Sequence, residues 1–260
     1  MKIAFYDSSL TDAQWNLLEP LIPKPRKKGR PQIDRRKIVD AILYVAKGGI
    51  QWRLLPHDFP CWQTVYHVFR RWTLDNTWDG LNARLRAQVR ATEGKDCRPT
   101  AAILDSQSVK SDPHGGEVGY DSAKKIKGRK RHILVDTLGL LLGIVVTPAS
   151  TPERDGGQAL LQRTVAVFTW LRLLWVDGGY TGPAFAAWVA NLRSTLKVEV
   201  VKRSDDAAGF EVLPRRWVVE RTFGWLMRHR RLVRDYEVTE TSAAAWAYIA
   251  MIRIQLRRLA

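Results

Sequence analysis

Short β-forming runs alternate with helical stretches from residue 99 to the C-terminus, and this alternation restricts the possible folds more than any other feature. Runs rich in Val, Ile and Leu predict strands at 101–104, 132–136, 140–147, 173–176 and 197–202. A turn signal at 137–139 joins the second and third runs into a hairpin. Helical spacing predicts helices at 152–171, 183–194, 214–231 and 241–258. This order predicts an α/β fold with a mixed sheet of about five strands and flanking helices.

The residues before this alternation show only helical patterns, with apolar side chains every three or four positions. We therefore predict a small all-helical region at 1–94 and an α/β domain at 99–260, joined by a polar linker. Short helices and the basic segment at 24–31 are typical of helix-turn-helix DNA readers. A helical cap packed on the main domain fits the same pattern, so both interpretations stay open.

The chain carries a large positive charge that indicates a polyanionic partner. It has 260 residues, with 42 Lys and Arg against 26 Asp and Glu, which gives a formal net charge of +16. Such a charge attracts nucleic acid first and an anionic membrane surface second. Its apolar runs are shorter than the about 20 residues of a membrane helix, so we expect a soluble, cytoplasmic protein. Its two cysteines form no C-x-x-C pair, which argues against disulfides and zinc, and we expect both to be buried.

Three acidic residues stand out by their positions in the predicted elements. Asp105 and Asp177 each follow a predicted buried strand, and in open α/β sheets ligands gather beyond the strand ends. Glu220 is the only acid in an arginine-rich helical segment whose other residues are mostly apolar. The simpler interpretations are turn or cap aspartates and an intrahelical pair between Glu220 and Arg216.

Three carboxylates without a convergent Cys or His cluster suit Mg²⁺ or Mn²⁺, which prefer oxygen ligands. Two such ions can clamp the attacking and leaving oxygens of a phosphodiester. A positively charged protein with this site is expected to act on a nucleic-acid backbone.

Basic runs flank the candidate site, at 124–131 and at 228–234. Charge runs are usually solvated faces, but two of them beside one candidate site favour contact with phosphates. The candidate DNA-contacting residues are Lys124, Lys125, Lys127, Arg129, Lys130, Arg131, Arg216, Arg221, Arg228 and Arg231.

Three motifs together resemble the DDE transposases of bacterial insertion sequences. They are LDSQSVK at 104–110, VDGGY at 176–180 and RRWVVERTFGWLMRHRRL at 215–232. The resemblance runs from about Leu10 to the C-terminus and is closest to the group with a short helical N-terminal region and a ribonuclease-H-like core. It implies that Asp105, Asp177 and Glu220 form a metal-binding triad.

The last motif departs from the family at two positions. Related families space a tyrosine, an arginine, a glutamate and a lysine with two, three and six residues between them. Arg216 and Glu220 keep this spacing, while Leu213 and Met227 stand at the tyrosine and lysine positions and Arg228 follows one step on.

The resemblance implies a transposase that binds element ends, cleaves double-stranded DNA with Mg²⁺ or Mn²⁺, two ions in all, and joins the freed 3′-OH to target DNA. It also implies a dimer or larger assembly on DNA, association with the nucleoid, and no membrane. Two other readings are a ribonuclease-H-like nuclease that cuts without joining and a non-enzymatic DNA-binding regulator.

Overall fold

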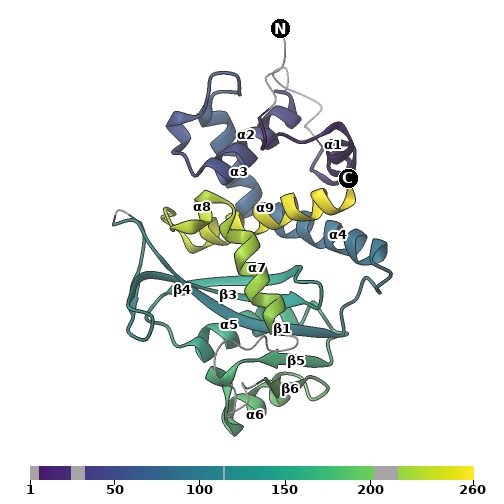
Figure 1. Cartoon of the computed structure of the whole chain (residues 1–260), viewed down its shortest axis with the longest axis vertical. Coiled ribbons are helices and arrows are strands. Elements are labelled where there is room, and N and C mark those ends of the chain that lie inside the picture. Colours follow the sequence, from purple (N-terminus) through teal and green to yellow (C-terminus); the bar gives the residue numbers. More distant parts are fainter. Residues whose placement is uncertain (1–5, 25–32, 114, 202–215) are drawn as a thin grey trace.

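The computed structural model describes residues 6–24, 33–113, 115–201 and 216–260. Most of the predicted basic segment at 24–31 and the first two residues of the predicted helix at 214–231 lie outside this range. In the described part, a layer of helices packs on one side of a sheet, and two further helices lie on the other side (Figure 1).

The predicted N-terminal helices are confirmed. Thr11 and Gln14 form a capping box at the first of them. Asp34 caps the second, because its side chain accepts a hydrogen bond from the Arg36 N–H. Gly49 ends that helix at φ 70°, and a Cβ there would lie 2.9 Å from the Arg230 Cβ, so glycine fits this close approach. The four helices are α1 (Asp12–Leu18), α2 (Arg35–Gly48), α3 (Trp62–Leu74) and α4 (Thr77–Thr92), with short 3₁₀ turns at Glu19–Leu21 and Trp52–Leu54.

The sheet confirms the predicted mixed α/β fold and has six strands. Its order is β2-β3-β1-β5-β6, and β4 also pairs with β3. Strands β1, β5 and β6 run parallel, while β3 is antiparallel to β1, β2 and β4. The sixth strand, β2, was not predicted because three residues are too few to show an alternation. The strands are β1 (Ala101–Lys110), β2 (Gly119–Asp121), β3 (Ile126–Asp136), β4 (Leu141–Pro148), β5 (Leu173–Val176) and β6 (Lys197–Val200).

Two strands are longer than predicted. β1 continues past its apolar start to Lys110, and β3 begins at Ile126 within the basic run. These additional residues pair with one another along the β1–β3 ladder, from Gln107 opposite Arg131 to Lys110 opposite Gly128. These polar extensions show no apolar pattern in the sequence. They form strands because their backbones pair with each other.

Each face of the sheet is covered by its own apolar cluster. Ala102 and Leu104 of β1 belong to a cluster with α5 and α6, whereas Ile103 belongs to one with α7 and α9. This alternation follows from the two-residue period of a strand. The helices are α5 (Glu153–Val165), α6 (Pro183–Leu192), α7 (Trp217–Met227), α8 (Arg230–Val233) and α9 (Glu240–Leu259), with a 3₁₀ turn at Gly178–Tyr180.

Helix α9 lies between the N-terminal helices and the sheet (Figure 1). Its Trp246 is 1% exposed, with its ring centroid 4.6 Å from that of Phe69 in α3 and 5.5 Å from that of Trp52. The first and last helices therefore share one core. None of the described helices combines the length and hydropathy needed to cross a bilayer. The prediction of buried cysteines is wrong, since Cys61 and Cys97 are both exposed.

A buried ion pair ties α4 to the turn between β3 and β4. Arg90 Nη1 lies 2.7 Å from Asp136 Oδ2, and both side chains are at most 6% exposed. The other oxygen, Asp136 Oδ1, accepts hydrogen bonds from the Leu138 and Leu140 N–H groups, each at 2.9 Å. Asp136 therefore satisfies a buried guanidinium and the backbone of the turn together.

Replacing Asp136 with alanine leaves Arg90 buried without its partner, so we expect the free energy of unfolding to fall by about 3–5 kcal/mol. Urea unfolding followed by circular dichroism measures the change. Asp12→Ala is the matched control, because Asp12 pairs with Arg36 with 84% of its side chain exposed. Its midpoint should equal that of the wild type. Equal midpoints for both variants would contradict a stabilising role for the buried pair.

Candidate functional site

The register of the sheet brings Asp105 and Asp177 together. Strands β1 and β5 pair in parallel from Ala101 opposite Leu173 to Ile103 opposite Trp175. The same offset, continued by two residues, places Asp105 opposite Asp177. Ile103 and Trp175 belong to the apolar cluster on the α7 side, so the acids two residues further on share that face.

Asp105 lies within β1 and not at its end as predicted. Strand β1 runs on to Lys110 because β3 pairs with it throughout, whereas β5 stops at Val176. Asp177 then caps the turn that follows, accepting a hydrogen bond from the Gly179 N–H at 2.9 Å. The acids therefore lie where β5 ends, and not where β1 ends as we expected.

Helix α7 supplies Glu220 and Arg216 to the same side of the sheet. Arg216 Nη2 lies 3.7 Å from Asp105 Oδ2 and 3.6 Å from Glu220 Oε1. The intrahelical pair between Arg216 and Glu220 is thus present, and the same guanidinium also reaches Asp105. Arg216 lies between the first and last of the three predicted acids.

A fourth acid, Glu153 in the first turn of α5, also belongs to this site. Its Oε1 accepts hydrogen bonds from Ser106 Oγ and Lys124 Nζ, both at 2.9 Å. A Cβ on Gly179 would lie 2.9 Å from Glu153 Oε2 and 3.0 Å from Asp177 Oδ1, so these two carboxylates are close neighbours. Sequence reasoning missed Glu153, because an acid in the first turn of a helix is common for reasons of helix polarity alone.

Asp105 is mostly buried, and the acids Asp177 and Glu153 lie near it. Burial raises the pKa of Asp105 to about 6, and the charges of Asp177 and Glu153 add to the rise. The Ser106 N–H, 2.7 Å from Asp105 Oδ1, and the Arg216 guanidinium oppose this shift. The pKa of Asp105 rises on balance because burial and the neighbouring acids outweigh the Ser106 N–H and the Arg216 guanidinium.

Tyr180 faces the same acids from within the core. It is 1% exposed, and its hydroxyl has no hydrogen-bond partner in the described part of the chain. Burial raises the pKa of Tyr180, and Asp105, Glu153 and Asp177 raise it further. The hydroxyl therefore keeps its proton in the field of these three carboxylates.

The chemistry of this donor set fits a hard divalent cation, since carboxylate oxygens are its preferred ligands and a buried carboxylate here lacks compensation. The spacing is not that of a closed metal site. Within the described ranges, no group of three or more Asp, Glu, His or Cys side chains lies close enough to hold an ion. Arg216 separates Asp105 from Glu220 in this conformation.

Burial contradicts the prediction that four of the basic residues contact DNA. Lys130 pairs with Asp121 at 3.4 Å, and Arg131 donates to the Leu232 carbonyl oxygen at 2.7 Å. These side chains lie inside because β3 is an interior strand whose charges are matched by acids and carbonyl groups. Arg129, Lys130, Arg131 and Arg231 are all at most 8% exposed, and Arg129 and Arg231 pair with Asp235 and Glu237.

The other predicted DNA-contacting residues reach solvent at least in part. Arg216 is half-buried between two acids, and Arg221 is half-buried over the rings of Trp217 and Trp225, at 4.3 and 4.5 Å from their centroids. The exposed members are Lys124, Lys125, Lys127 and Arg228.

Two family models match the chain. Residues 96–254 match the family described as "Transposase DDE domain". Residues 10–82 match the family described as "Putative transposase of IS4/5 family". Both families name the same class of protein, and together they span most of the chain.

Two curated proteins are similar to parts of the chain. One is the "Insertion element IS402 uncharacterized 16.2 kDa protein" of Burkholderia cepacia, 34% identical over 117 residues, which are 42% of this chain and 78% of that protein. The other is the "Uncharacterized protein y4sN" of Sinorhizobium fredii, 30% identical over 81 residues, which are 31% of this chain and 65% of that protein.

The raised pKa of Asp105 predicts a specific dependence of stability on pH. Between about pH 4 and 6 the folded chain keeps a proton that the unfolded chain has lost, so rising pH lowers the free energy of unfolding in this window. Asp105→Asn mimics the protonated acid. We expect it to be more stable than the wild type by roughly 3 kcal/mol at pH 8 and equal to it near pH 4. Urea unfolding at both pH values tests this, and a less stable variant at pH 8 would contradict it.

Proposed function

The chain belongs to the DDE-domain transposase family, and we propose that it binds the ends of its insertion element, cleaves phosphodiesters there with divalent metal ions and joins the freed 3′-OH to target DNA. The observation that supports this proposal most is the placement of Asp105, Asp177 and Glu220. Residues far apart in the sequence converge on one side of the sheet, with Arg216 in contact with two of them.

Asp105, Asp177 and Glu220 are the proposed ligands of Mg²⁺ or Mn²⁺. Two bound ions would lower the pKa of the attacking water and stabilise the charge that develops on the phosphodiester. Within the protein, the register of β1 and β5 fixes the first two carboxylates, and α7 presents the third from above the sheet. Glu153, held by Ser106 and Lys124, keeps a further negative charge beside Asp177.

Arg216 is proposed to control when this site is complete. Its guanidinium occupies the space between Asp105 and Glu220, where a metal ion would bind, and partly neutralises their charge. Two oxygens of a DNA phosphate can accept two parallel hydrogen bonds from the planar guanidinium of Arg216, which is the geometry that arginine favours. Bound DNA would thus withdraw Arg216 from the acids and free them for metal.

The remaining proposed roles concern DNA. Lys124, Lys125, Lys127 and Arg228 are exposed and are proposed to contact phosphates, the three lysines near the acids and Arg228 at the C-terminal end of α7. We propose that the region at 1–94 recognises element ends, that the region at 99–260 carries out the chemistry, and that two ends are held by a dimer or larger assembly.

The family supports a transposase over a regulator without enzymatic activity. Cutting without joining is a separate possibility that an assay decides. Incubating the chain with radiolabelled element ends, plasmid DNA and Mg²⁺ should yield labelled plasmid. Cut ends without labelled plasmid would show a nuclease that does not join.

The proposed triad predicts which carboxylates cleavage requires. We expect Asp105→Asn, Asp177→Asn and Glu220→Gln each to slow Mg²⁺-dependent nicking of element ends by more than about 100-fold, since even outer partners of metal ligands contribute 10–100-fold. Binding to the same DNA should persist, because each change removes a negative charge. Glu93→Gln, an exposed acid at the end of α4, is the control and should nick normally. Normal nicking by Asp105→Asn would contradict the proposal.

The position of Arg216 predicts that it competes with metal ions. We expect Arg216→Gln to bind Mn²⁺ more tightly than the wild type without DNA, by about tenfold, and to nick DNA more slowly. Electron paramagnetic resonance of free Mn²⁺ measures the affinity. Weaker Mn²⁺ binding by Arg216→Gln would show that the guanidinium supports the metal site and does not block it.

A further inference from the structure

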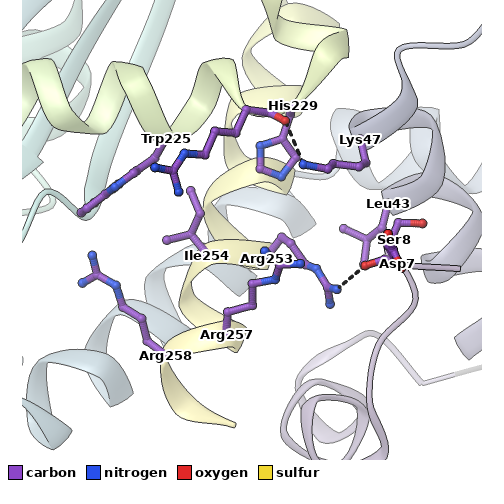
Figure 2. Close-up of a pocket in the computed structure, with 11 residues that line it drawn as sticks. Asp7, Ser8, Leu43, Lys47, Trp225, His229, Arg253, Ile254, Arg257 and Arg258 are labelled. Carbon is purple, nitrogen blue, oxygen red and sulfur yellow. Dashed lines mark hydrogen bonds between the residues drawn. The ribbon is translucent and has the colours of Figure 1, made fainter.

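A basic pocket lies on the far end of α7 from the acids, where α2, α7 and α9 come together. It has a volume of about 330 Å³, and we call it the α9 pocket. Figure 2 shows its side chains, drawn from these three helices and from the segment before α1. Five of the residues that line it are cations, Lys47, Arg228, Arg253, Arg257 and Arg258.

The positive charge in the α9 pocket is only partly balanced by the described part of the protein, where the charge of Asp40 acts on Arg253 from outside the pocket. Its only acid is the exposed Asp7, and none of the five cations lies within 4.0 Å of a carboxylate in the described ranges. Lys47 and Arg253 donate to main-chain carbonyl oxygens of Arg228 and Asp7, as the dashed lines in Figure 2 show. The exposed Arg228 and Arg257 side chains have no hydrogen-bond partner among the residues described.

Helix polarity explains part of this arrangement. Lys47, Arg228 and Arg257 stand at the C-terminal ends of α2, α7 and α9, where a cation is favourable. Three such ends converge here, however, so the cations also repel one another. Burial lowers the pKa of the neighbouring His229 to about 4, and Lys47 and Arg257 lower it further. The buried Nδ1 of His229 also lacks a partner in the described structure.

The α9 pocket is continuous with the acids along an exposed ridge of α7. Glu220, Gly224 and Arg228 are spaced four residues apart, so they follow one face of the helix, and all three are exposed. A Cβ on Gly224 would have no neighbour within 4 Å, so nothing in the described protein requires glycine there. A glycine within a helix is destabilising, but it lets a ligand approach the backbone closely.

The distance along this ridge suits a DNA strand. Arg228 is eight positions after Glu220, so the helix rises by about 12 Å between them at about 1.5 Å per residue. Each DNA strand carries one phosphate per about 3.4 Å of duplex axis. A strand whose reacting phosphate lies at Glu220 therefore brings a phosphate about three or four nucleotides away to the α9 pocket.

We propose that the α9 pocket binds a backbone phosphate of the same DNA whose cleavage site lies at the acids, with Arg228 and Arg257 as its main contacts. The inference rests on the proposed function, and it adds the C-terminal helix to the DNA-binding surface. Lys47 and Arg253 complete the pocket by holding the end of α7 and the segment before α1 in place.

The test measures how DNA binding depends on salt. Each lost phosphate contact lowers the slope of log K against log salt concentration by about 0.9 for duplex DNA. We therefore expect the Arg228→Gln/Arg257→Gln variant, which loses the one phosphate that both side chains hold, to have a slope smaller in magnitude by about 0.9 than that of the wild type on a duplex carrying the element end. Fluorescence anisotropy at several salt concentrations measures it. Both side chains are exposed, so the melting temperature should not change.

Arg163→Gln is the matched control, because Arg163 is exposed on α5, beyond the opposite face of the sheet. Its slope should equal that of the wild type. An unchanged slope for the double variant, or an equal loss for Arg163→Gln, would overturn the inference. Failure of the proposed function itself would appear elsewhere, as absence of metal-dependent nicking by the wild-type chain, which this binding assay does not require.

Discussion

The parallel pairing of β1 with β5 is the constraint on which the site depends. Its register sets Asp105 against Asp177 in a partly desolvated position, which is electrostatically unfavourable without a cation. Arg216 supplies part of that charge, and Glu153 and Glu220 add further negative charge around it. The proposed exchange of Arg216 for divalent ions would supply the positive charge that this side of the sheet lacks.

The same protein uses many of its other cations to build its interior. Arg90 secures the turn after β3, while Arg129, Lys130 and Arg131 bind acids and carbonyl groups from within that strand. A high positive charge therefore does not measure the DNA-binding surface directly. Among the residues predicted to contact DNA, the exposed ones are Lys124, Lys125 and Lys127 near the acids and Arg228 at the far end of α7, and these are the cations that the proposed function uses.

Helix α9 connects the two parts of the chain that the sequence pattern separates. Trp246 packs against Phe69 of α3, and the same apolar cluster reaches α7 and the sheet. The N-terminal helices are thus positioned by the C-terminus of the chain as well as by their own neighbours. This shared core also creates the α9 pocket, because it brings the ends of α2, α7 and α9 to one place.

Residue patterns predicted the class of fold and most helices and strands, and they singled out the three acids, because hydrophobic periodicity and short motifs are local properties. Residue patterns could not predict the length of β1, the presence of Glu153 at the site, or the burial of Arg129 and Arg131. Each depends on which strands pair and which segments cover them, and these contacts join residues far apart in the chain. The position of Arg216 between Asp105 and Glu220 could be seen only in the folded chain, because it follows from how α7 packs over β1.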